Sequence, residues 1–207
     1  GYRRAQMADV AARAGVAKGT VYLYFESKDA LFDAVLRHAD APEGAEPPQT
    51  LPVPTPGAGA TLEMIRKRIA EETALPTLAG VLGRRRITDV GAEVEGVVRE
   101  LYALLKRYRT SIKLLDRCAP DHPELAAVWY GTGGEGALDL LRRYLEERIQ
   151  RGRLPAVKDP AITARLVLEM VVFWAVHRHW DPKPQPMDEQ RAEEARPRLD
   201  DTIYRII

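Results

Sequence analysis

The chain has 207 residues, of which 45% are hydrophobic and 29% are charged, a composition typical of an ordinary globular protein. Its 31 Lys and Arg residues nearly balance its 30 Asp and Glu residues, so net charge alone indicates neither a nucleic acid nor a membrane as partner. The single cysteine, Cys118, excludes an internal disulfide framework. The most apolar run, 170–176, is far shorter than the ~20 residues of a membrane-spanning helix. No secretory signal is visible, and the cytoplasm is the expected location.

Residues 1–40 predict three helices. Apolar residues recur at helical spacing in the first of them: Met7, Val10, Ala11 and Ala14. Gly15 is expected to end that helix at its C′ position. Ser27 can cap the third helix, whose apolar stripe consists of Leu31, Phe32, Val35 and Leu36. Between them, residues 15–28 read GVAKGTVYLYFESK, a stretch of weak helix formers flanked by better ones.

Residues 41–59 differ in composition from the rest of the chain. Six prolines fall within these nineteen residues, and proline lacks the backbone N–H that regular helices and sheets require. This segment is therefore expected to be an extended linker or a surface excursion.

Helical spacing continues beyond the proline-rich segment, and no stretch alternates as a strand would. Thr61 is predicted to cap one helix. A second, long helical segment carries apolar residues from Val90 to Leu115. The sequence CAPDHPEL at 118–125 is expected to end it, because it contains two prolines.

Three further helical segments are expected in the last part of the chain. One ends near Gly152, the next is capped by Asp159 and continues to about Trp180, and DPKPQP at 181–186 separates it from the last. Pro197 predicts a kink within that last segment. The predicted fold is therefore all-α. It has three parts: a three-helix head (1–40), the proline-rich linker or excursion (41–59) and a larger helical body (60–207).

The short helix within 15–28 has two different faces. At about 100° per residue, Val21 and Phe25 point the same way and are expected to meet a core made by Val10, Ala14 and Leu31. The outward face consists of Gly19, Thr20 and Leu23, with Tyr22 and Tyr24 on its flanks. A helix, a glycine turn and a second short helix describe a helix-turn-helix, whose second helix enters the major groove of DNA. The outward face is thus predicted to meet DNA.

The residue types on this face suit a duplex. Gly19 has no side chain, so a DNA backbone can approach closely. Thr20 can hydrogen-bond a base edge or a phosphate, and Leu23 can contact a thymine methyl group. The tyrosine hydroxyls and Lys18 suit phosphate oxygens. Lys28 follows the cap of the next helix, where free backbone N–H groups and an ammonium can share one anion.

Simpler explanations exist for each feature taken alone. A short helix with exposed aromatic residues also fits a packing connector inside a larger helical bundle, and Lys28 could pair with Asp29 on a solvated surface. The combination within one short segment is what favours DNA binding. The alternative function is a helical ligand-binding or scaffold dimer that no longer binds DNA.

The string VAARAGVAKGTVYLYFESKDALFDAVL, residues 10–36, resembles the DNA-binding head of TetR-family transcriptional regulators. The similarity rests on an alanine-rich helix, the turn at Gly15, the aromatic residues after Lys18-Gly19, and Ser27-Lys28. It implies DNA contacts at Ala17, Lys18, Gly19, Thr20, Tyr22, Tyr24 and Lys28. It also implies a homodimer, most often a repressor, that binds a palindromic operator in double-stranded DNA and leaves it when a small molecule occupies the body.

Two features depart from the family pattern. Family heads carry an amphipathic helix ahead of the residues that correspond to GYRRAQ (1–6), and this sequence does not include it. The third helix of the head generally continues closely into the body, whereas here the proline-rich segment intervenes.

One apolar stripe of the body carries a single polar group at its end: Met170, Phe173, Trp174 and His177. Such a stripe fits ordinary core, and it also fits the wall of a ligand cavity, which is apolar with few polar anchors. Trp129 and Tyr130 form another bulky pair. These six residues are the predicted effector pocket, for a small hydrophobic effector with His177 as its hydrogen-bonding partner.

The last two helical segments are predicted to form the homodimer interface. Their apolar stripes, and the ending IYRII, would be poor surface for a monomer. A two-fold dimer would place its recognition helices about 34–36 Å apart, one turn of DNA. The family resemblance favours the same segments.

Other motifs do not support a cofactor or an active site. GTGGEG at 131–136 spells a dinucleotide fingerprint, but both of its flanks are helical in pattern. The three arginines at 84–86 fit a solvated helix end. No zinc spacing is matched by the possible ligands Cys118, Asp121, His122 and Glu124. We therefore expect no metal, no cofactor and no enzymatic activity.

Overall fold

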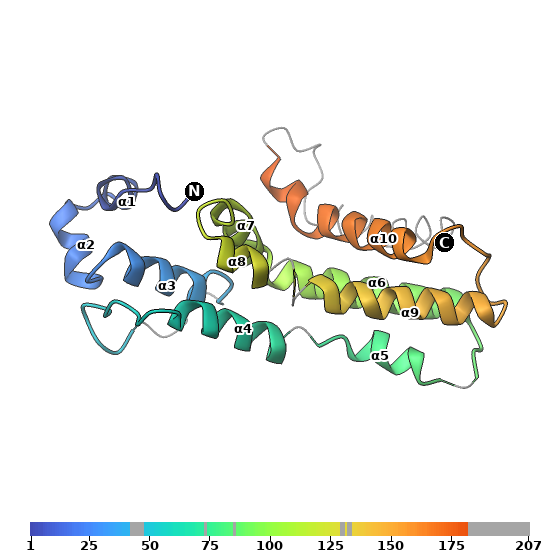
Figure 1. Cartoon of the computed structure of the whole chain (residues 1–207). Coiled ribbons are helices and arrows are strands. Elements are labelled where there is room, and N and C mark those ends of the chain that lie inside the picture. The colour runs from blue at the N-terminus through green and yellow to red at the C-terminus, as the bar shows by residue number, and fades with distance from the viewer. Residues whose placement is uncertain (42–47, 73, 85, 129–130, 132–133, 182–207) are drawn as a thin grey trace. The chain divides into compact units, whose positions relative to one another are not determined.

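The computed structural model describes residues 1–41, 48–72, 74–84, 86–128, 131 and 134–181 (Figure 1). Regular structure in these ranges is helical, with one isolated bridge and no strand, which confirms the predicted all-α fold. The elements are α1 (Met7–Ala14), α2 (Lys18–Tyr24), α3 (Lys28–His38), α4 (Ala60–Glu72), α5 (Pro76–Leu82), α6 (Val90–Arg107), α7 (Arg109–Cys118), α8 (Pro123–Ala127), α9 (Gly134–Gln150), α10 (Pro160–Ala175) and the 3₁₀ helix η2 (His177–Trp180). None of these described helices has the length and apolar character needed to cross a membrane.

Contacts divide the chain into two compact units, each made of two segments. The first unit consists of Gly1–Glu72 and Thr110–Thr132, and the second of Thr73–Arg109 and Gly133–Ile207. The helix-turn-helix therefore shares a unit with α4, α8 and nearly all of α7, whereas the predicted head stops at residue 40. The assignment of DNA binding to residues 1–40 and of effector binding and dimerisation to residues 60–207 stays a prediction.

The first unit begins with a helix-turn-helix. α1 is followed by Gly15, whose φ of 69° lies in the left-handed region that glycine adopts readily, and whose N–H donates to the Ala12 carbonyl (3.3 Å). The Ser27 hydroxyl accepts from the N–H of Ala30 (3.1 Å) at the start of α3. Both predicted helix ends are confirmed.

A small core holds the helix-turn-helix together. Its buried residues are Met7, Ala11 and Val21, with Phe25 and Leu31 packed against them. The inward direction predicted for Val21 and Phe25 is thus correct. The prediction that Ala14 belongs to this core is wrong, because Ala14 is exposed. The buried face of α1 consists of Met7 and, one turn later, Ala11.

A second core in this unit joins helices from distant parts of the sequence. It consists of Leu36, Ile65, Ile69, Leu115, Leu125 and Val128. Burial of each such side chain contributes about 1.5–3 kcal/mol relative to exposure. α3 supplies Leu36, whereas Val35, predicted for the same stripe, is 41% exposed.

Thr61 does not cap α4 as predicted. The helix begins one residue earlier, at Ala60, and the Thr61 hydroxyl donates to the Asp33 carboxylate (2.8 Å). Asp33 is 7% exposed and also accepts from Arg37 (2.5 Å). A buried carboxylate needs such partners, and this need explains why the hydroxyl points to α3.

The long segment predicted over 90–115 consists of two helices, α6 and α7. Tyr108 separates them with a φ of −101° and a ψ of 20°. The Asp40 carboxylate accepts from the backbone N–H groups of Thr110 (2.9 Å) and Ser111 (3.2 Å), and so caps the start of α7. This cap comes from 70 residues away in the sequence, where no local pattern reveals it.

The second unit contains α5, α6, α9 and α10. α10 begins at the predicted cap, Asp159, whose carboxylate accepts from the Ala161 N–H (2.9 Å). The α-helix ends at Ala175, and after Val176 the 3₁₀ helix η2 continues to Trp180, the predicted end of this segment.

One stretch of the proline-rich segment contacts the helix-turn-helix through Val53 and Thr55. Val53 forms an isolated parallel bridge with Phe25, just after α2. We call residues 51–55 the strap. Its contacts place this stretch in the first unit, and the choice between linker and surface excursion for residues 41–59 stays a prediction.

Candidate nucleic-acid interface

The outer face of α2 is open to solvent. Exposed residues on the helix and its N-cap are Ala17, Lys18, Gly19, Tyr22, Leu23 and Tyr24, and Thr20 is half-buried. Leu23 is 69% exposed, and the two tyrosines are 43% and 49% exposed. Large side chains gathered in one exposed patch are typical of an interaction surface. The structure thus brings all but one of the predicted DNA-contacting residues onto a single short helix.

The inner face of α2 fixes the helix in place. Val21 is only 6% exposed, and Phe25 packs against the same core. A Cβ atom added to Gly19 would meet no atom within 4 Å. Packing inside the protein therefore does not require glycine at this position, and the missing side chain leaves room for a partner.

Lys28, the remaining predicted contact, lies at the start of α3 and is held by the N-terminal segment. Its Nζ is 4.2 Å from the centroid of the Tyr2 ring and 3.5 Å from the Arg3 carbonyl oxygen. The Asp29 carboxylate, the alternative partner of Lys28, accepts instead from the Tyr2 hydroxyl. Burial, followed by this hydrogen bond, raises the pKa of Tyr2. Sequence reasoning missed Tyr2, because 27 residues separate it from Asp29 and no pattern links them.

The candidate metal ligands between α7 and α8 have other surroundings. The Asp121 carboxylate accepts from the Arg3 N–H (2.9 Å), which lowers its pKa. The His122 Nδ1 lies 3.1 Å from the Glu124 carboxylate. Cys118 is 3% exposed, and burial raises the pKa of its thiol. In the part of the chain that the structure describes, no group of three or more His, Cys, Asp or Glu residues is placed to hold a metal.

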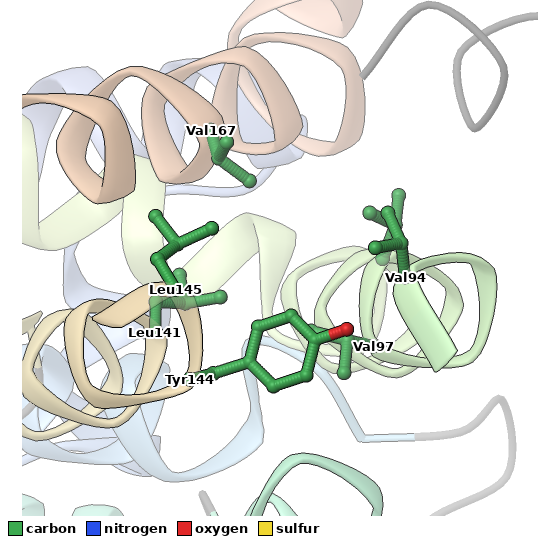
Figure 2. Close-up of a pocket in the computed structure, with 7 residues that line it drawn as sticks. Val94, Val97, Leu141, Tyr144, Leu145 and Val167 are labelled. Carbon is green, nitrogen blue, oxygen red and sulfur yellow. The ribbon is translucent and has the colours of Figure 1, made fainter. Parts of the chain in front are cut away.

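A small apolar cavity lies between α6, α9 and α10 (Figure 2). Its lining residues are Val94, Val97, Val98, Leu141, Tyr144, Leu145 and Val167. The cavity has a volume of ≈ 10 Å³, about the space of one water molecule. In Figure 2 the Tyr144 ring extends from α9 toward Val97 of α6. Burial, followed by the nearby charge of Glu93, raises the pKa of Tyr144.

None of the predicted effector residues that the structure describes lines this cavity. Their exposure differs: Met170, Trp174 and His177 are half-buried, and Phe173 is 48% exposed. The rings of Phe173 and Trp174 meet edge to face, with 5.9 Å between centroids. The other two predicted residues, Trp129 and Tyr130, lie outside the described residues. The effector pocket stays a prediction.

α10 carries an apolar stripe on its exposed side. Ile162, Leu166 and Phe173 are 60%, 55% and 48% exposed, and their spacing places them on one face. The opposite face is buried and consists of Ala164, Val167, Leu168, Val171 and Ala175. An exposed apolar stripe is typical of an interface with another molecule. The last predicted helical segment, within 187–207, lies outside the described residues.

Two family models match the sequence. The model of bacterial regulatory proteins of the tetR family matches residues 1–35, and the model of the C-terminal domain of AefR-like transcriptional repressors matches residues 107–196. No curated protein matches the chain in sequence.

Two solved structures resemble the chain over nearly all of its length. A structure described as a TetR-family transcriptional regulator from Mesorhizobium loti MAFF303099 is 18% identical, with a TM-score of 0.53, and the match covers 100% of this chain and 88% of that one. The fatty acid degradation regulator FadR from Bacillus halodurans is 19% identical, with a TM-score of 0.44 and coverage of 99% and 86%. The first of these likenesses supports the fold.

Proposed function

This chain belongs to the TetR family of DNA-binding transcriptional regulators, and we propose that it is a repressor that binds a palindromic operator as a homodimer. The observation that carries the proposal is the exposed face of α2, where Gly19 leaves an open approach next to Lys18, Tyr22 and Tyr24. Binding of a small hydrophobic effector releases the protein from the operator. The cytoplasm, where the operator lies, is the place of action.

α2 acts as the recognition helix in the major groove. Thr20 hydrogen-bonds a base edge or a phosphate, and Leu23 contacts a thymine methyl group. The open surface at Gly19, and the small side chain of Ala17 at the N-cap, let the helix come close to the DNA. The exposure of this face supports the assignment.

Phosphate contacts set the register of the helix on the duplex. Lys18 and the hydroxyls of Tyr22 and Tyr24 surround the base-reading face and bind phosphate oxygens. Lys28 binds a further phosphate together with the free N–H groups at the start of α3. These cations make operator affinity dependent on salt.

Two copies associate through the exposed stripe of α10, which consists of Ile162, Leu166 and Phe173. The helical segment predicted from the sequence within 187–207 completes this proposed interface. A two-fold axis between the two protomers brings two copies of α2 to half-sites about 34–36 Å apart. A palindromic operator is the sequence that such a dimer reads.

The effector binds at the stripe of α10 and η2 that consists of Met170, Phe173, Trp174 and His177. It releases the operator by binding better to a conformer that fits DNA less well. A coupling free energy of about 1–3 kcal/mol corresponds to a roughly 5- to 150-fold change in operator affinity.

Selection of bound fragments from a random duplex library, followed by sequencing, tests the DNA-binding proposal. A single palindromic motif is expected. On that motif, Lys18→Ala should weaken binding and reduce the slope of log K against log salt concentration by about 1. Lys158→Ala, which changes an exposed lysine of the second unit, is the matched control and should change neither quantity. Failure to select any duplex would favour the ligand-binding or scaffold dimer without DNA affinity.

Thermal shift with a panel of planar hydrophobic compounds tests the effector proposal. Compounds that raise the Tm of the wild type should raise that of Trp174→Ala less. Trp180→Ala is the matched control, since this tryptophan of η2 is 43% exposed. Equal shifts in both variants would place the effector elsewhere.

A further inference from the structure

The strap is bonded to the end of the recognition helix. The Val53 N–H donates to the Tyr24 carbonyl (2.8 Å), and the Val53 carbonyl accepts from the Glu26 N–H (3.0 Å). These two bonds make the bridge that pairs Val53 with Phe25. They join the last residue of α2 and the turn into α3 to one residue of the proline-rich segment.

A second pair of contacts is made by Thr55. Its N–H donates to the Glu26 carboxylate and its hydroxyl donates to the Ser27 Oγ, both at 2.8 Å. Ser27 is the N-cap of α3, and its Oγ also accepts from Ala30. The strap therefore contacts both the end of α2 and the start of α3.

α2 needs such support. Lys18–Tyr24 makes fewer than two full turns, and helices this short are marginal on their own. The last four carbonyl groups of a helix have no partner within it. The Val53 N–H gives one of them, that of Tyr24, a partner. Packing by Val21 and Phe25 holds the inner face of the helix, but it gives the Tyr24 carbonyl no hydrogen-bond partner.

The composition of the strap fits support of α2 and does not fit an ionic contact between the strap and a DNA phosphate. All of its residues, LPVPT, are uncharged, so it supplies no cation to a phosphate. Pro52 and Pro54 fix φ on both sides of Val53, and this reduces the number of conformations available to an undocked strap.

We propose that the strap is a positioning element of the DNA interface, and that the backbone of Val53 holds the C-terminal end of α2 in the geometry that fits the groove. This inference rests on the proposed function. The strap orders the recognition helix in advance, so that DNA does not have to order it on binding. Loss of the strap then weakens operator binding although every DNA-contacting side chain is still present.

Val53→Pro tests the inference, because proline deletes the N–H that bonds Tyr24 while its neighbours already keep this stretch extended. Gln49→Pro is the matched control, since it adds a proline to the same segment outside the strap. Val53→Ala keeps both backbone groups and tests whether the side chain matters.

Two quantities are measured at a temperature at which circular dichroism shows each variant to be fully folded: amide hydrogen exchange at residues 22–26, and the Kd of the selected operator. Val53→Pro should exchange faster at 22–26 and should raise the Kd roughly 3- to 10-fold, as expected for the loss of about one net hydrogen bond. The salt dependence of log K should not change, because the phosphate contacts remain. Gln49→Pro and Val53→Ala should behave as the wild type does.

Unchanged exchange at 22–26 in Val53→Pro, or an unchanged Kd, would overturn the inference. If Val53→Pro does not fold, the double variant Pro52→Gly/Pro54→Gly loosens the strap but keeps its hydrogen-bonding groups, and a rise in Kd of about two- to threefold is then expected. If the wild type selects no duplex, the proposed function fails separately, and the exchange result alone decides whether the strap holds α2.

Discussion

The guanidinium of Arg148 and the carboxylate of Glu93 form an ion pair inside the second unit, with 2.7 Å between Nε and Oε2. Arg148 is 0% exposed and Glu93 is 7% exposed. The same guanidinium donates to the Val81 carbonyl (2.6 Å), so one side chain of α9 bonds both α5 and α6. Burial by itself lowers the pKa of Arg148, but the hydrogen bond and charge of Glu93 outweigh it and raise the pKa.

Arg148→Met is expected to lower the free energy of unfolding by about 3–5 kcal/mol, because it leaves the Glu93 carboxylate buried without its partner. Urea denaturation measures this loss. The double variant Glu93→Met/Arg148→Met should recover most of it. An exposed pair provides the control: Arg165→Met, which removes the partner of Glu169, should cost less than ~1 kcal/mol. A double variant as unstable as the single one would contradict this explanation.

Tyr144→Phe should leave the free energy of unfolding unchanged or raise it by about 1 kcal/mol. The reason is that the Tyr144 hydroxyl is buried beside Glu93 and Arg148 but makes no hydrogen bond of good geometry with any described residue. Urea denaturation of the variant and the wild type measures the difference.

The pH dependence of the same variant gives a second test. The raised pKa keeps Tyr144 protonated in the folded state, while the unfolded chain ionises at pH about 10. The contribution of protonated Tyr144 to the free energy of unfolding is therefore fully present below pH about 10, and it decreases as the pH rises above that value. Tyr144→Phe should lose less stability between about pH 10 and 11 than the wild type. An equal loss would show that the hydroxyl does not titrate as the structure implies.

Gly19→Ala should separate stability from DNA binding. Alanine favours helix over glycine by about 0.5–1 kcal/mol, and its Cβ meets no atom within 4 Å, so the free protein should gain stability. Operator affinity should fall, because the methyl group occupies space left for the DNA. Gly80→Ala in α5, where a Cβ also meets no atom within 4 Å, is the control and should leave affinity unchanged. Unchanged affinity in Gly19→Ala would argue against a close approach.

Lys28→Met removes the ammonium from the Tyr2 ring but keeps most of the side-chain stem. Loss of the cation–π contact should lower the free energy of unfolding by about 0.5–1 kcal/mol. Loss of a phosphate contact should also reduce the salt slope of operator binding by about 1. Lys28→Arg should preserve both quantities. An unchanged salt slope in Lys28→Met would show that this lysine contacts no phosphate, which leaves only its contacts with the Tyr2 ring and the Arg3 carbonyl.

Leu166→Glu should convert the proposed dimer to a monomer, because it places a charge in the exposed apolar stripe of α10. Light scattering coupled to gel filtration measures the mass. Leu23→Glu is the control, since this leucine is 69% exposed on α2, and it should remain dimeric. A dimer that survives Leu166→Glu would exclude this stripe from the interface.

Features that depend on neighbours close in sequence could be predicted. Gly15, Ser27 and Asp159 each act on backbone groups within a few residues of them, so local sequence was enough to place these helix ends. The outward face of α2 follows from the helical period in the same way, because Val21 fixes which side is buried.

Features that depend on distant partners could not be predicted. The break at Tyr108 occurs where Asp40 caps the next helix, and the strap pairs with α2 across 28 residues or more. Both faces of α10 are apolar, so periodicity alone could not decide which one is buried. The predicted stripe at 170–177 includes the exposed Phe173, whereas the buried face contains Val167 and Val171.

The second core of the first unit has a consequence for how this protein is made. Leu115, Leu125 and Val128 complete the apolar cluster around Leu36, although they follow it by much of the chain. Synthesis of the chain must therefore pass Val128 before this core of the first unit can be completed. For the same reason, a fragment that ends at Glu72 lacks half of this core and leaves Leu36, Ile65 and Ile69 without their distant partners.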